Sequence, residues 1–235
     1  MTKRTILISG TSKGIGHALS EMLLKDGHRV IGISRTSSNS LNEIDGYTEF
    51  LCDLSDEQKL HETMKDITRA YPQLDALVCN AGAGRFGGVE EFSPEQIAHS
   101  LRLNLLNPVL LTRFCLPILQ KHSSSDVIFI GSESALKGGK RGTLYSASKF
   151  GVRGFAQALR QEVSGRGVRV SMIHPGMVRT SFFDELDFEP GPNEAHVVEL
   201  GDLCKAVKMV LDAAPSTVFE EIVVRPLKHV IAKKR

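Results

Sequence analysis

The 235-residue sequence lacks several signals that would place it in particular classes of protein. Its cysteines form no Cys-x-x-Cys pair and have no histidine cluster beside them, which favours reduced thiols and argues against a metal site. A formal net charge of +2 is too small to indicate nucleic acid or a membrane surface as partner. No apolar run approaches a membrane span, and the first residues lack the apolar core of a signal peptide. We therefore expect a soluble, cytoplasmic protein.

No repeat, linker or low-complexity tract divides the chain, so residues 1–235 are expected to form one domain. Short apolar runs alternate with longer amphipathic segments throughout. Strand candidates lie at residues 5–9, 28–33, 47–51, 74–78, 126–131, 168–173 and 220–224. Helical patterns lie near residues 14–26, 55–70, 93–120, 145–164 and 202–213, and residues 187–194 are interpreted as a loop. This alternation predicts an α/β fold with right-handed crossovers and a mainly parallel, doubly wound sheet.

The loop between the first strand and the first helix is rich in glycine. It contains Gly10, Gly14 and Gly16 in the pattern Gly-x-x-x-Gly-x-Gly, which differs from the usual Gly-x-Gly-x-x-Gly. Glycines allow a tight turn and a close approach of the backbone to a pyrophosphate, and the helix N-terminus adds unpaired N–H groups. With Ser12 and Ile15 between the glycines, the loop predicts a dinucleotide-binding site.

The second strand ends without the acidic residue that usually binds a free ribose 2′-hydroxyl. Ser34, Arg35 and Thr36 occupy that region, and Lys13 in the glycine loop adds a second cation nearby. A guanidinium binds a phosphate in a fork, whereas a carboxylate would repel it. The pattern favours NADP(H) over NAD(H). The alternative is that both cations are ordinary surface residues.

Two further strands end in residues suited to a ligand, because ligands bind at the carboxyl ends of strands in open α/β sheets. Asp53 and Leu54 follow the third strand and could contact the adenine, although Asp53 could instead cap the helix that starts near Ser55. The turn Asn80, Ala81, Gly82 follows the fourth strand.

Tyr145 and Lys149 are four residues apart in a predicted helix, so their side chains share one face. A free phenol titrates near pH 10, and a neighbouring ammonium can lower that pKa by about 1–3 units. Ser132, at the end of a strand, has a hydroxyl that could hold the same carbonyl oxygen. The pattern predicts a proton donor and acceptor, while the alternative is a helix that carries Tyr and Lys by chance.

Taken in order, these residues resemble the short-chain dehydrogenase/reductase family over nearly the whole chain. The resemblance rests on the glycine loop, Asp53, Asn80-Ala81-Gly82, Asn104, Ser132, Tyr145-x-x-x-Lys149 and Pro175-Gly176. It implies a Rossmann-type sheet of about seven strands with helices on both faces. It also matches Lys13 and Arg35 to the positions of an NADPH-preferring member.

The resemblance implies a catalytic tetrad of Asn104, Ser132, Tyr145 and Lys149. Tyr145 would be the general acid in carbonyl reduction, and Ser132 would orient and polarise the carbonyl. Lys149 would lower the pKa of Tyr145 and hold the nicotinamide ribose, and Asn104, in a kinked helix, would support a water connecting Lys149 to solvent. The turn that contains Pro175, Gly176, Val178 and Thr180 would hold the nicotinamide.

The expected function is NADPH-dependent reduction of a small-molecule ketone or aldehyde, or the reverse oxidation of an alcohol. The chain ends without the Asp-Gly-Gly of typical 3-oxoacyl carrier-protein reductases, and it resembles instead the branch of 3-hydroxy acid dehydrogenases and carbonyl reductases. A carrier-protein reductase and a catalytically silent NADP(H)-binding regulator are the alternatives. The resemblance also implies a homodimer or homotetramer, formed through helices 108–120 and 145–164.

Substrate specificity is expected in three loops, at residues 83–88, 133–142 and 177–190. The last carries an apolar set suited to a lid or to a short amphipathic helix: Phe182, Phe183, Leu186 and Phe188. Four cations in or near these loops could attract a carboxylate or could be solvated surface charges: Arg85, Lys137, Lys140 and Arg141.

Overall fold

The computed structural model describes residues 3–234, which are organised by a seven-stranded sheet in the order β3-β2-β1-β4-β5-β6-β8. All neighbouring strands in this sheet are parallel. The strands are β1 (Thr5–Ser9), β2 (Arg29–Ser34), β3 (Tyr47–Leu51), β4 (Ala76–Cys79), β5 (Ser125–Ile130), β6 (Val168–Pro175) and β8 (Glu221–Val224). A separate antiparallel pair is formed by β7 (Phe188–Pro190) and β9 (Ile231–Lys233). The predicted doubly wound α/β fold is thereby confirmed.

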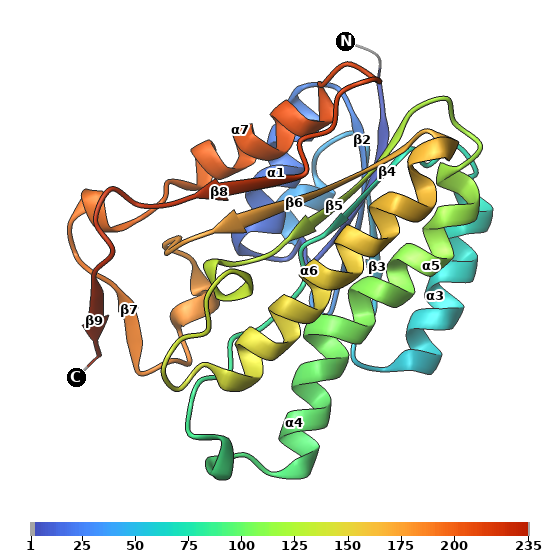
Figure 1. The fold of residues 1–235 in the computed structure, drawn as a ribbon. Coiled ribbons are helices and arrows are strands. Elements are labelled where there is room, and N and C mark those ends of the chain that lie inside the picture. The colour runs from blue at the N-terminus through green and yellow to red at the C-terminus, as the bar shows by residue number, and fades with distance from the viewer. Residues whose placement is uncertain (1–2, 235) are drawn as a thin grey trace.

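Helices cover both faces of the sheet (Figure 1). One face carries α1 (Gly14–Lys25) and α7 (Leu200–Leu211); the other carries α3 (Glu57–Ala70), α5 (Asn107–Leu119) and α6 (Thr143–Val163). Shorter helices are α2 (Asn39–Asn42), α4 (Pro94–Leu101), the π-helix η2 (Arg102–Leu106) and the 3₁₀ turns η1 (Val89–Glu91), η3 (Glu133–Ala135), η4 (Ser164–Arg166), η5 (Ser181–Phe183) and η6 (Glu194–His196). Within residues 3–234, no helix has the length and apolarity needed to cross a membrane.

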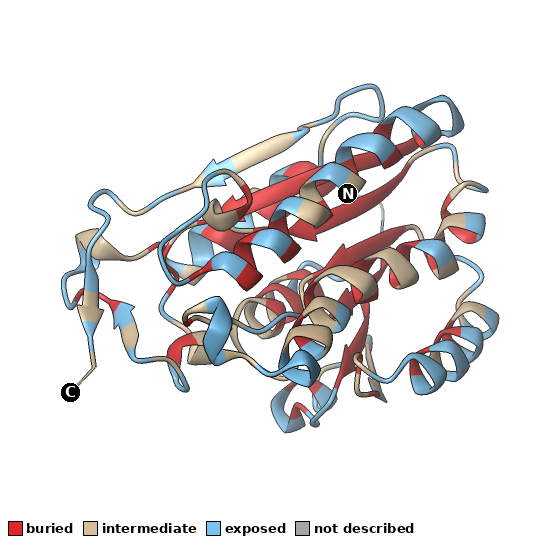
Figure 2. Ribbon diagram, turned by 60° about the horizontal axis from the view of Figure 1, so that its bottom comes forward, coloured by how far each residue is buried: buried red, intermediate tan, exposed pale blue. Residues whose placement is uncertain are grey.

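The central strands are buried on both faces, as Figure 2 shows, because helices cover them from each side. Every residue of β1, β4, β5 and β6 is buried. Leu7 of β1 packs in the cluster shared with α3, α5 and α6, whereas Ile6 and Ile8 pack with α1 and α7. Alternate side chains of one strand therefore join two cores, which is why such strands consist of nearly continuous apolar residues.

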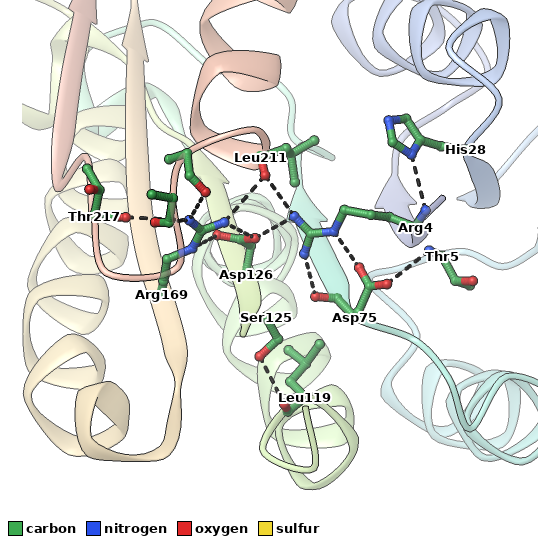
Figure 3. Close-up of polar contacts among 12 residues, drawn as sticks. Arg4, Thr5, His28, Asp75, Leu119, Ser125, Asp126, Arg169, Leu211 and Thr217 are labelled. Carbon is green, nitrogen blue, oxygen red and sulfur yellow. Dashed lines mark hydrogen bonds and ion pairs between the residues drawn. The ribbon is translucent and has the colours of Figure 1, made fainter. Parts of the chain in front are cut away.

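The amino-terminal edge of the sheet carries a network of buried charges (Figure 3). Asp126 at the start of β5 is fully buried and binds both Arg169 at 2.8 Å and Arg4 at 2.7 Å. Arg4 also binds Asp75 at 2.7 Å. Both guanidiniums donate to the carbonyl of Leu211, the last residue of α7. The network therefore joins four segments of the sheet edge, at β1, β4, β5 and β6, to the end of a helix.

Three predicted elements differ in detail from the structure. The single helix expected over 93–120 is α4 and α5 joined through the π-helix η2. The helix expected from Ser55 begins at Glu57, and its cap is Asp56, whose side chain accepts from Lys59 N at 3.0 Å. The loop expected at 187–194 contains β7, which pairs with β9 near the end of the chain; such a long-range pairing leaves no local pattern.

Candidate active site

The glycine loop adopts a backbone that requires its glycines. Gly10 and Gly14 have φ angles of 77° and 64°, in the left-handed region that favours glycine. At Gly16 a Cβ atom would lie 2.2 Å from the carbonyl oxygen of Gly10, so α1 could not pack against the loop with any other residue there. Lys13 caps α1 without a side-chain hydrogen bond. The backbone N–H groups at the start of α1 are therefore left for an anion.

Ser9 and Asn80 hold the ends of β1 and β4 together. The hydroxyl of Ser9 accepts from the N–H groups of Asn80 at 3.0 Å and Ala81 at 3.1 Å. The Asn80 amide in turn donates to the carbonyls of Ser9 at 2.9 Å and Gly10 at 3.1 Å. These bonds fix the crevice between β1 and β4, where crossovers leave the sheet in opposite directions.

The glycine loop has a second support, a contact between Thr11 and Tyr47, that was not predicted from the sequence. The hydroxyl of Thr11, fully buried, lies 2.8 Å from the phenol of Tyr47 on β3. The phenol passes over Gly32, where a Cβ would lie only 2.1 Å from its oxygen. Burial raises the pKa of Tyr47, so the phenol stays protonated. The only sequence signal was Gly32 inside a strand, which marks a close approach of other atoms.

Most of the predicted cofactor residues line one cavity of about 550 Å³ beside the glycine loop. They are Gly10, Ser12, Lys13, Gly14, Ile15, Ser34, Arg35, Thr36, Asp53, Leu54, Asn80, Ala81, Gly82 and Thr180. Gly16 does not line the cavity, and its place is in the packing of α1.

The polar residues of this cavity are arranged by local hydrogen bonds. Ser34 donates to the carbonyl of Thr36 at 2.7 Å, which turns the chain and leaves the Arg35 side chain exposed at the cavity. Asp53 accepts from the backbone N–H of Ser55 at 2.9 Å and from its hydroxyl at 2.7 Å. These bonds hold the pKa of Asp53 below its usual range. Asp53 therefore forms a turn and does not cap α3.

A second cavity, of about 790 Å³, contains the other predicted residues except Gly16 and Asn104, and Asn104 lines the first cavity. Its lining includes Ser132, Tyr145, Lys149, Pro175, Gly176, Val178 and Thr180. Ile15, Asn80 and Gly82 line both cavities, so the two spaces meet at the carboxyl ends of β1 and β4. The two cavities thus adjoin near the predicted catalytic side chains.

Tyr145 is enclosed by aromatic rings. The ring centroid of Phe86 lies 5.3 Å from that of Tyr145, and the centroid of Phe182 lies 5.8 Å away. Burial raises the pKa of Tyr145 to about 12, against the opposing effect of a hydrogen bond with the Ser132 side chain. The Ser132 side chain therefore lies near enough to the Tyr145 phenol to act on its pKa.

The pKa of Tyr145 is raised overall, whereas we expected Lys149 to lower it. The Lys149 ammonium donates to the carbonyl of Ile130 at 3.0 Å and lies 5.7 Å from the centroid of the Tyr145 ring. Burial lowers the pKa of Lys149 to about 8. Desolvation of the phenol outweighs any effect of a cation at this distance.

Asn104 lies in the π-helix η2, which interrupts the α-helical hydrogen bonding between α4 and α5. Its amide group forms two hydrogen bonds with Ala83, accepting from the N–H at 3.0 Å and donating to the carbonyl at 2.9 Å. A Cβ at Gly82 would lie 2.9 Å from the Asn104 oxygen and 3.8 Å from the Lys149 nitrogen. Asn104 thus approaches Lys149 across Gly82, and its amide binds the loop that carries Phe86.

Five aromatic side chains form a closed circuit at the second cavity. Successive ring centroids are 5.0 to 5.9 Å apart through Tyr145, Phe86, Phe188, Phe183 and Phe182. The predicted segment 177–190 supplies three of these rings, but not through an amphipathic helix, since it forms η5 and β7. Phe86 was not singled out by sequence. Leu186 and Arg85 line the first cavity instead.

Comparison with known proteins extends these observations. A family model described as short chain dehydrogenase matches residues 4–190. The chain is 28% identical over 238 residues to sepiapterin reductase of Chlorobaculum tepidum, covering 95% of this chain and 96% of the relative. It is 31% identical over 183 residues to carbonyl reductase family member 4 of Xenopus tropicalis, covering 77% of each.

Solved structures resemble the whole fold. An alcohol dehydrogenase from Thermococcus sibiricus, complexed with 5-hydroxy-NADP, superposes with a TM-score of 0.87 at 23% identity, covering 97% of this chain and 99% of the other. A metagenomic short-chain oxidoreductase in complex with NADP superposes with a TM-score of 0.81 at 26% identity, covering 95% and 96%. Since the family model spans most of the sequence and the fold agrees along its whole length, the chain belongs to the short-chain dehydrogenase/reductase family.

Proposed function

We propose that the protein is an NADPH-dependent reductase that converts a small-molecule ketone or aldehyde to an alcohol, or catalyses the reverse oxidation. The observation that carries this proposal is the position of Tyr145, Ser132 and Lys149. All three line the larger cavity where it joins the space beside the glycine loop. A carbonyl group placed against Tyr145 would therefore have a proton donor and a dinucleotide site within the same enclosure.

The smaller cavity fits a dinucleotide with a 2′-phosphate. The positive φ angles of the glycine loop and the uncapped start of α1 suit a pyrophosphate. Lys13 and Arg35, both exposed at this cavity, would bind the 2′-phosphate. Asp53 and Leu54 would contact the adenine, and the turn 175–180 would hold the nicotinamide. When bound, NADPH would supply the hydride for the reduction.

In the proposed reaction Tyr145 donates the proton from its hydroxyl to the carbonyl oxygen of the substrate. Its raised pKa of about 12 keeps that proton in place near neutral pH. Ser132 donates a hydrogen bond to the same oxygen, which stabilises the negative charge that develops there. Lys149 would hold the nicotinamide ribose and lower the barrier to proton loss from Tyr145, a role that requires its ammonium to leave the carbonyl of Ile130 or to share it.

The names of the relatives support a reductase. They include sepiapterin reductase, carbonyl reductase family member 4 and 3-oxoacyl-[acyl-carrier-protein] reductase. Because 3-oxoacyl carrier-protein reductases are among these relatives, reduction of a 3-oxoacyl carrier protein is the second candidate function, although the chain lacks their usual Asp-Gly-Gly ending.

The test is oxidation of NADPH against a panel of aldehydes, α-diketones and 3-oxo acids, with Tyr145→Phe beside the parent. Tyr145→Phe keeps the ring and removes the proton donor, so we expect turnover to fall by about 10²–10⁴-fold, the usual contribution of a general acid. NADPH affinity, measured by fluorescence, is the control and should stay unchanged. Equal turnover by both proteins would contradict the mechanism. Binding of NADPH without turnover by either would favour the silent regulator.

The preference for NADPH has its own test in Arg35→Asp. A carboxylate at this position repels a 2′-phosphate and can bind a free ribose hydroxyl. We expect the variant to bind NADH more tightly than NADPH, the reverse of the parent. A parent that already binds NADH more tightly would contradict the assignment.

We further propose a cytoplasmic homodimer or homotetramer. The four cysteines are free and buried, which suits a reducing compartment. Phe150 on α6 is 43% exposed, while Leu159 on the same helix belongs to the core. Light scattering of the purified protein gives the oligomeric state, and a monomer at micromolar concentration would contradict this part of the proposal.

A further inference from the structure

The segment that follows β8 builds the outer wall of the larger cavity. Its strand β9 pairs with β7, and the two lie side by side away from the main sheet (Figure 1). Backbone hydrogen bonds join Lys234 N to the Asp187 carbonyl at 2.9 Å, Gly191 N to the Val230 carbonyl at 3.0 Å, and Lys228 N to the Ala195 carbonyl at 2.8 Å. The family model ends at residue 190, so this wall lies outside the part of the chain that it matches.

This wall directs a cation toward the cavity. Phe188 and Lys233 are directly opposite in the antiparallel pair, so their side chains lie on the same face. Both line the cavity, as does Ile231 two residues before Lys233. Because side chains alternate along a strand, Ile231 and Lys233 lie on the same face of β9, next to Phe188 of the aromatic circuit.

A second group of cations approaches the same part of the circuit from the loop before α6. Lys137 and Lys140 line the cavity. The loop is held against Phe86, because Gly87 N donates to the Arg141 carbonyl at 2.7 Å and a Cβ at Gly142 would lie 3.4 Å from the Phe86 ring. The centroids of Phe86 and Phe188 are 5.0 Å apart. Lysines from two distant segments thus flank one pair of rings.

The acids at this cavity are already engaged with arginines. Glu133 binds Arg225 at 2.9 Å, and Arg141 binds Glu91 at 2.9 Å. Asp187, the other carboxylate in the lining, acts on Arg141 as well. Within residues 3–234, the three lining lysines Lys137, Lys140 and Lys233 have no carboxylate within 4.0 Å. The outer part of the cavity therefore carries an excess of positive charge.

We infer that the substrate is a carbonyl compound with an apolar, ring-sized body that carries a carboxylate at the end remote from the carbonyl. The carbonyl lies at Tyr145 and Ser132, the body lies against Phe86 and Phe188, and the carboxylate lies among the three lysines. This inference rests on the proposed function. It adds a charge requirement that the catalytic residues alone do not impose.

The test compares 4-formylbenzoate with its methyl ester, two aldehydes that differ in charge at the far end of one ring. We expect the parent to have a higher kcat/KM for the acid, mainly through KM. Because an exposed ion pair is worth up to about 1 kcal/mol, removing one lysine should lower the acid-to-ester ratio by roughly two- to five-fold. The variants are Lys233→Gln and Lys137→Gln/Lys140→Gln. Lys228→Gln, in the same terminal segment but outside the lining, should leave the ratio unchanged.

The dependence on salt gives a second measurement. Screening should reduce the acid-to-ester ratio of kcat/KM in the parent and leave it constant in a triple variant in which Lys137, Lys140 and Lys233 are all replaced by Gln. A ratio that is the same in the parent and the triple variant would overturn the inference even if both aldehydes are reduced. If neither aldehyde is reduced, a binding measurement decides the inference, and the wider panel of carbonyl compounds decides the proposed function separately. This measurement uses calorimetry with NADP⁺ present and compares the binding of 4-(hydroxymethyl)benzoate with that of its methyl ester. If the parent and the triple variant bind the acid equally tightly, the charge requirement is refuted.

Discussion

His174 on β6 holds Ser132 through the main chain. Its Nδ1 lies 3.1 Å from the Ser132 carbonyl oxygen, and the imidazole is fully buried. A carbonyl oxygen only accepts, so Nδ1 carries the proton. Burial lowers the pKa of His174, and its Nε2 has no hydrogen-bond partner although Glu221 lies 3.4 Å away. The end of β5 is thereby fixed from one side by His174 and from the other by Lys149, which binds Ile130.

This contact predicts that His174→Gln slows turnover, because the glutamine amide overlies Nε2 and leaves the Ser132 carbonyl without its donor. Loss of one buried hydrogen bond costs about 1–3 kcal/mol, so we expect kcat to fall by roughly ten-fold or more. His174→Asn, whose amide overlies Nδ1, should keep most of the activity. NADPH affinity should be the same in both variants, and equal kcat values for Gln and Asn would contradict the positioning role.

The lowered pKa of Lys149 predicts a change of stability with pH. Between about pH 8, its folded pKa, and its ordinary value of 10.5, the unfolded chain holds a proton that the folded chain does not. The free energy of unfolding therefore rises with pH across this window, by about 3 kcal/mol in total for this group. Below pH 8 the folded protein contains a buried ammonium at Lys149, which lowers its free energy of unfolding.

Lys149→Met removes that ammonium and should remove the rise. Urea denaturation of parent and variant at pH 7.5 and pH 9.5 measures it as a difference between the two proteins. The difference cancels the opposite contributions of Tyr145 and of the buried cysteines, whose raised pKa values lower the free energy of unfolding as the pH rises. Lys121→Met, at the exposed end of α5, is the control. A variant at Lys149 with the pH dependence of the parent would refute the assignment.

The bond between Tyr47 and Thr11 predicts an effect on cofactor binding from a residue that does not line the cofactor cavity. Tyr47→Phe leaves the buried Thr11 hydroxyl without this partner, at a cost of about 1–3 kcal/mol in the free energy of unfolding. The glycine loop should become less well held, so the Kd for NADPH should rise several-fold. Tyr71→Phe, on the end of α3, serves as control in thermal denaturation and cofactor titration. An unchanged Kd would limit Tyr47 to a role in stability.

The charge network at the other end of the sheet predicts a loss of stability without a loss of site chemistry. Asp126→Asn leaves Arg4 and Arg169 buried beside a neutral amide (Figure 3), and breaking such a buried pair costs about 3–5 kcal/mol. Asp202→Asn breaks an exposed, solvent-screened pair with Lys205 and should cost far less. Urea denaturation compares them. Folded Asp126→Asn should bind NADPH like the parent, and weaker binding would show that the two sheet edges are coupled.

The sequence was sufficient for the seven-stranded sheet, the glycine loop and most of the candidate site residues, because these follow from spacing along single segments; Phe86 and Lys233, which also line the larger cavity, were not singled out. Tyr145 and Lys149 share a helix, and the Gly10–Gly16 pattern lies between neighbouring elements. The supports could not be predicted this way. His174 meets Ser132, and Tyr47 meets Thr11, only because the topology brings different strands together. The raised pKa of Tyr145 depends likewise on Phe86 and Phe182, which come from separate loops.

The pairing of β9 with β7 has a practical consequence for anyone who purifies this protein. Strand β9 supplies Ile231 and Lys233 to the lining of the larger cavity, whereas the chain enters the sheet at Arg4, at the opposite edge. A bulky group attached close to Lys233 would therefore stand beside the substrate pocket, and assays of such a protein would measure that group as well as the pocket. A group attached close to Arg4 would stand at the sheet edge remote from both cavities.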